Sequence, residues 1–149
     1  GVGIAFLFVP QLFKADTLNY ALAIVGSIFF FFGTIFFAAV GLTPHDLYLD
    51  LHIFFAVNAF RFLVPGSIFY LIVLLRSPIE NKYAFVVMFF LICTFSYVIY
   101  QLNGGNPLDD KEEMVRQAVI QKLITVINVA SIFSLSFAFS SQLKNLKLN

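Results

Sequence analysis

The chain has 149 residues, of which 60% are hydrophobic and 11% are charged, whereas about a quarter of the residues of an average soluble domain carry a charge. This composition places the chain in the membrane class. The net charge is +1 and the basic residues are scattered, so no positive field exists to gather nucleic acid, and nucleic-acid binding is excluded. The expected partners are membrane lipids.

Apolar segments of membrane length predict four transmembrane helices. About 20 apolar residues cross a hydrocarbon core of ~30 Å, and four such segments are joined by polar links. The predicted spans are 20–42, 53–75, 83–102 and 118–143. The apolar segment 1–13 is too short to cross, and we expect either the end of a longer span or an interfacial segment there.

The predicted fold class is therefore an all-α membrane protein with a single transmembrane domain, residues 1–149. It forms a bundle of four transmembrane helices, or it is a fragment of a five- or six-helix bundle. Asp109 or Asp110 is expected to cap the last helix, with Glu112 or Glu113 completing a capping box. Pro65 should kink the second span, because proline removes a backbone donor.

The distribution of basic residues predicts the orientation, because Lys and Arg in short loops favour the cytoplasm. One side of the bundle holds Lys14, Arg76, Lys82, Lys144 and Lys147. The other side holds Lys111 and Arg116, with Lys122 further inside the helix. We therefore expect a plasma-membrane protein with a cytoplasmic C-terminus.

Arg61 is the one charged residue within the apolar segment 53–75. Counted from His52, it lies roughly 13 Å along the helix, near the middle of the membrane. A lipid-facing arginine there costs at least ~2.5 kcal/mol, so we expect Arg61 to face protein or a water-filled cavity. The alternative is that it snorkels to the interface or binds carbonyls freed by a kink at Pro65.

The last span carries polar residues on one face, within a sector of about 120° at 100° per residue. This polar seam consists of Gln117, Gln121, Thr125, Asn128 and Ser131. We predict that the seam, with Arg61, Asn58 and Lys122, lines an outward-opening pocket for an anionic lipid or amphiphile. The alternative is that the amides and hydroxyls only form hydrogen bonds between helices.

Both histidines lie beside two aspartates in the link before the second span. Imidazole and carboxylate ligands together hold zinc, and a site left open for water supports hydrolysis. The four candidate ligands are His45, Asp46, Asp50 and His52. Their spacing is not a recognised zinc signature, so the simpler prediction is a polar turn in which Thr43 and Pro44 open a helix capped by Asp46.

Two short motifs at this link resemble a known group of proteins. They are Gly41-Leu-Thr-Pro44 at the end of one span and His52-Ile-Phe-Phe-Ala56 at the start of the next. This pattern is similar to uncharacterised prokaryotic multi-span proteins, distantly similar to the Frag/DRAM/Sfk type of membrane protein. The resemblance covers about Asn19 to Gln121. It implies five or six spans and a lipid-associated or regulatory role, and it transfers no catalytic residue.

The function expected from these features is non-enzymatic binding of an anionic lipid or amphiphile, with no cofactor. One alternative is an accessory subunit whose helices pack on other membrane subunits or on a second copy of the chain. The other is a membrane-embedded, metal-dependent lipid hydrolase that uses the four candidate ligands.

Overall fold

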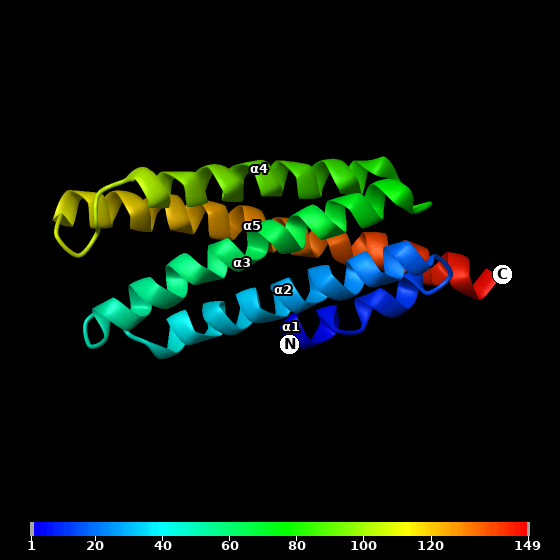
Figure 1. Ribbon diagram of the computed structural model, residues 1–149, viewed down its shortest axis with the longest axis horizontal. Coiled ribbons are helices and arrows are strands. Elements are labelled where there is room, and N and C mark those ends of the chain that lie inside the picture. Colours follow the sequence, from blue (N-terminus) through cyan, green and yellow to red (C-terminus); the bar gives the residue numbers. More distant parts are fainter. Residues whose placement is uncertain (1, 149) are drawn as a thin grey trace.

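The computed structural model describes the backbone of residues 2–148 and the side chains of residues 2–144. Within this range all the regular secondary structure is helical (Figure 1). The elements are α1 Val2–Phe6, the 3₁₀ helix η1 Val9–Phe13, α2 Thr17–Leu42, α3 Leu49–Arg76, α4 Asn81–Asn103 and α5 Lys111–Leu148. The predicted all-α class is confirmed, and the four long helices are long and apolar enough to cross a membrane.

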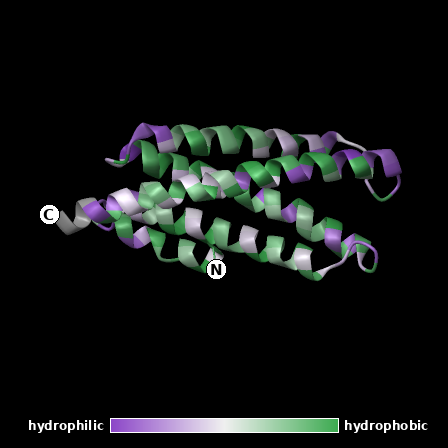
Figure 2. Ribbon diagram, turned by 180° about the vertical axis from the view of Figure 1, so that it is seen from behind, coloured by the Kyte–Doolittle hydropathy of each residue, from purple (hydrophilic) through white to green (hydrophobic). Residues whose placement is uncertain are grey.

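The long helices pack in chain order, α2 on α3, α3 on α4 and α4 on α5. The links 43–48 and 104–110 lie at one end of the bundle, which we call the loop end (Figure 1). Figure 2 shows hydrophilic residues gathered towards the two ends and mostly apolar residues between them. Within the described residues the backbone of α5 makes no close approach to α2 or α3, so space is left between α5 and this helix pair.

The N-terminal apolar segment fills part of this space. The ring of Phe6 stacks on Phe30, with centroids 4.7 Å apart, and its other neighbours are Tyr70 of α3 and Phe139 of α5. Only 4% of Phe6 is exposed, and η1 also contacts both α2 and α5. The N-terminal segment is thus part of the helical core.

Close approach of α2 and α3 depends on glycines. A Cβ atom at Gly66 would lie 3.4 Å from the carbonyl oxygen of Gly26. A Cβ atom at Gly26 would lie 2.9 Å from the ring of Tyr70, which is fully buried. Small residues let helix backbones approach in this way, and the pair α2–α3 forms the most extensive helix contact of the bundle.

The start of α5 agrees with its predicted cap. Asp110 lies directly before the helix and its Oδ1 accepts a hydrogen bond from the backbone amide of Glu112 at 2.9 Å. Glu113 does not complete a capping box, because its carboxylate binds other partners described below.

The predicted cap of α3 by Asp46 is wrong. The backbone amides of Leu47 and Tyr48 bind the carbonyl oxygen of Pro44, which forms a turn and delays the helix to Leu49. The N-cap position falls on Tyr48, which makes no side-chain capping bond. The helix then runs through Pro65 without interruption to Arg76.

Candidate functional site

A groove of about 410 Å³ lies where α5 separates from α2 and α3. We call it the interhelical groove. Its lining is mainly apolar, and it has the volume of a small-molecule site, for which 300–1,000 Å³ is typical. The lining residues are Phe37 and Val40 of α2, Ala56 and Phe60 of α3, and Gln121, Lys122, Thr125 and Val126 of α5.

The polar groups of this groove all come from α5. The hydroxyl of Thr125 donates to the carbonyl oxygen of Gln121 at 2.8 Å, so it has no proton left to donate to a ligand. Lys122 is exposed and forms no ion pair within the described part of the chain. The groove therefore offers one cationic group and the Gln121 amide beside apolar walls.

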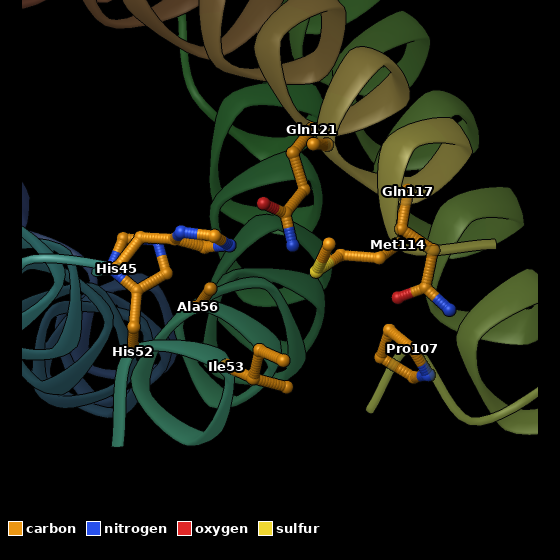
Figure 3. A pocket seen from close by; sticks show the side chains of 9 residues that line it. His45, His52, Ile53, Ala56, Pro107, Met114, Gln117 and Gln121 are labelled. Carbon is orange, nitrogen blue, oxygen red and sulfur yellow. The ribbon is translucent and has the colours of Figure 1, made fainter. Parts of the chain in front are cut away.

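A smaller pocket of about 70 Å³ adjoins the groove at the loop end, and Gln121 lines both. We call it the histidine pocket. His45 and His52 lie on one side, while Met114, Gln117 and Gln121 project from α5 on the other (Figure 3). The two imidazole rings meet edge to face with centroids 5.9 Å apart. Met114 was not among the predicted site residues, because nothing in its sequence neighbourhood links it to the histidines.

A hydrogen-bond network behind the pocket orients Gln117. The carboxylate of Glu113 is buried and accepts bonds from the Tyr100 hydroxyl at 2.7 Å and from Arg116 and Gln117 at 3.0 Å each. The Gln117 amide nitrogen also donates to Gly105 at 3.4 Å. Because the nitrogen is engaged there, the amide oxygen turns towards the pocket (Figure 3). The spacing of Glu113, Arg116 and Gln117 at i, i+3 and i+4 was the sequence signal for this network.

No family model, curated protein or solved structure matches the chain. The resemblance to the Frag/DRAM/Sfk type therefore stays a prediction. Function has to be inferred from the groove, the pocket and the residues that line them.

The structure does not bring Arg61 to the polar seam. Arg61 is exposed and lies on a stripe of α3 with Phe54, Ile68 and Leu75, each seven residues from the next and each exposed. The neighbouring Phe60 takes the inward position, and 100° of helix rotation carries Arg61 away from it. The depth of Arg61 along α3 follows from counting residues in the sequence. The direction of its side chain depends on which face of α3 packs against the other helices.

Asn58 lines neither the groove nor the histidine pocket, and its amide donates to the carbonyl oxygen of Phe54 at 2.8 Å within the same helix. Asn128 does face inward and is 7% exposed, and its Oδ1 has no partner within the described residues. Ser131, one turn further along α5, is also buried. The seam is thus divided, with Gln117 and Gln121 at the pocket and Asn128 deeper in the bundle.

The four candidate metal ligands do not converge. Within the described side chains, no group of three or more His, Cys, Asp or Glu residues is placed to hold a metal ion. His45 and His52 stay together, whereas Asp50 lies with Leu47 and Tyr48 on a separate surface. The four residues therefore do not form the metal site that the hydrolase hypothesis requires.

Proposed function

We propose that this chain is an integral membrane protein that binds an anionic amphiphile in the interhelical groove. The acyl chain lies against Phe37, Phe60 and Val126, and the anionic group binds Lys122 and Gln121. The observation that carries the proposal is the position of Lys122, a cation at the edge of an apolar groove of about 410 Å³.

Lys122 follows the start of α5 by eleven residues, which corresponds to about 17 Å of helix. Charged residues at such positions in membrane helices are costly and mark binding or transport sites by default. At an effective dielectric constant of 20, an opposite charge about 4 Å away gains about 4 kcal/mol. A carboxylate or phosphate attached to a hydrocarbon chain satisfies both the ammonium and the apolar walls.

The proposal includes insertion in the plasma membrane with the loop end outward and the C-terminal end of α5 in the cytoplasm. The end opposite the loop end carries four basic residues, Lys14, Arg76, Lys82 and Lys144. Basic residues in short loops favour the cytoplasm, so we assign this end to the cytoplasmic side. The groove then opens near the outer leaflet, where a lipid reaches it sideways.

The proposal is tested by measuring the lipids that co-purify with the protein in mild detergent, by mass spectrometry. Lys122→Gln should lower the retained anionic lipid at least fivefold. Val126→Trp should lower it similarly, because the indole fills the groove. Lys111→Gln is the matched control, since Lys111 is exposed at the start of the same helix and does not line the groove.

Arg61→Gln separates this site from the one predicted from the sequence. Retention that survives Lys122→Gln but is lost in Arg61→Gln would place the lipid on the outer face of α3 and overturn the proposal. Unchanged lipid with loss of a co-purifying membrane protein in Lys122→Gln would favour the accessory-subunit alternative.

A further inference from the structure

The two histidines of the pocket have the separation of metal ligands. An imidazole nitrogen about 2 Å from a metal places the ring centroid about 3 Å from it, so two rings on one metal have centroids about 5–6 Å apart. The centroids of His45 and His52 are 5.9 Å apart. Side-chain motion at the exposed His45 is sufficient to adjust the ring planes, which are at present nearly perpendicular.

His52 is oriented by its second nitrogen. Its Nδ1 donates to the carbonyl oxygen of Thr43, with the two atoms 2.7 Å apart. In the neutral ring this assigns the proton to Nδ1 and leaves the lone pair on Nε2. Histidines that bind metals almost always hold their other nitrogen in this way, which fixes the tautomer and the direction of the ring.

The third donor comes from α5. Met114 lines the same pocket, and its sulfur lies across the space from the imidazoles (Figure 3). Gln117 projects from the same helix on the α5 side of the pocket, held by its bond to Glu113. The fold thus brings two imidazoles from the α2–α3 side and a thioether from α5 to a space of about 70 Å³.

The character of these donors selects the ion. Imidazole and thioether groups are uncharged, and no carboxylate lines the pocket among the described residues. Desolvation penalises a multiply charged ion most when no negative ligand compensates it, and thioether ligands favour Cu(I) over harder cations. We propose that the histidine pocket binds one Cu(I) ion through His45, His52 and Met114.

The test is a Cu(I) titration of the purified full chain under reducing conditions, in competition with a coloured Cu(I) chelator. Wild type should withdraw one Cu(I) per chain. Met114→Leu and His52→Gln should each weaken binding at least tenfold. Met88→Leu is the matched control, because Met88 is the only other methionine and is exposed on α4. Circular dichroism verifies that each variant is folded.

X-ray absorption of the Cu(I) form should show a sulfur neighbour that disappears in Met114→Leu. Equal Cu(I) affinity in wild type and Met114→Leu would overturn the proposal, as would Zn²⁺ binding as tight as that of Cu(I). Lys122→Gln should keep full Cu(I) binding. Failure of the lipid proposal therefore leaves this one standing, and the reverse also holds.

Discussion

The hydroxyl oxygens of Ser27 and Tyr70 lie 2.7 Å apart in the core and join α2 to α3. Ser27 Oγ also donates to the carbonyl oxygen of Phe6 at 2.6 Å. Because a serine hydroxyl has one proton, Tyr70 must be the donor to Ser27. One serine therefore connects three segments of the chain, and the two variants that remove this contact should differ in their effects.

Ser27→Ala should destabilise the fold more than Tyr70→Phe. Loss of Ser27 leaves both the Phe6 carbonyl and the Tyr70 hydroxyl unpaired, for which about 1–3 kcal/mol is typical, whereas Tyr70→Phe removes one hydrogen bond worth about 1 kcal/mol. Unfolding in detergent, followed by circular dichroism, measures both. Ser96→Ala on the exposed face of α4 is the control. Equal stability of Ser27→Ala and the control would contradict the assigned bonds.

Gly26→Ala should destabilise the protein by about 1–3 kcal/mol, the range for overpacking a core. The new methyl group would lie 2.9 Å from the ring of Tyr70, and that ring is fully buried. Gly41→Ala is the matched control in the same helix, because a Cβ atom there meets nothing within 4 Å. That variant should be neutral or slightly stabilising, since alanine favours helices over glycine. Similar thermal unfolding of the two variants would argue against close packing at Gly26.

Glu113→Ala should loosen the loop between α4 and α5. It removes the acceptor shared by Tyr100, Arg116 and Gln117. Hydrogen exchange of backbone amides in 104–110 should accelerate, because Gln117 and its bond to the Gly105 carbonyl oxygen are no longer held in place. Glu112→Ala, an exposed neighbour, is the control and should leave the exchange unchanged. Identical exchange in the two variants would show that the network does not hold the loop.

The proposed orientation predicts which loops react from outside the cell. In a Cys93→Ala background, Leu108→Cys at the loop end should react with an impermeant maleimide on intact cells. Asn81→Cys, at the start of α4 and at the opposite end, should react only after permeabilisation. Both positions are exposed. The reverse labelling pattern would invert the proposed topology and place the groove near the inner leaflet.

Local signals predicted the helices well and their rotation poorly. The four long helices overlap all the predicted spans, and Asp110 caps α5 as expected. The predicted cap at Asp46 was wrong because a turn at Pro44 delays the start of α3 to Leu49. The predicted placement of Arg61 at the polar seam was wrong for a different reason. The depth of Arg61 along the helix follows from counting residues, but the direction of its side chain follows from how α3 packs.

The sequence by itself determined an all-α protein with four apolar helices of membrane length, and it placed a polar face on α5. These properties follow from hydrophobic length and helical period, which are local. Only the tertiary structure decided that Lys122 borders the groove while Arg61 does not, and that Met114 joins the histidines. The rotation of each helix depends on contacts between distant residues, such as Gly26 with Tyr70, and no local pattern contains that information.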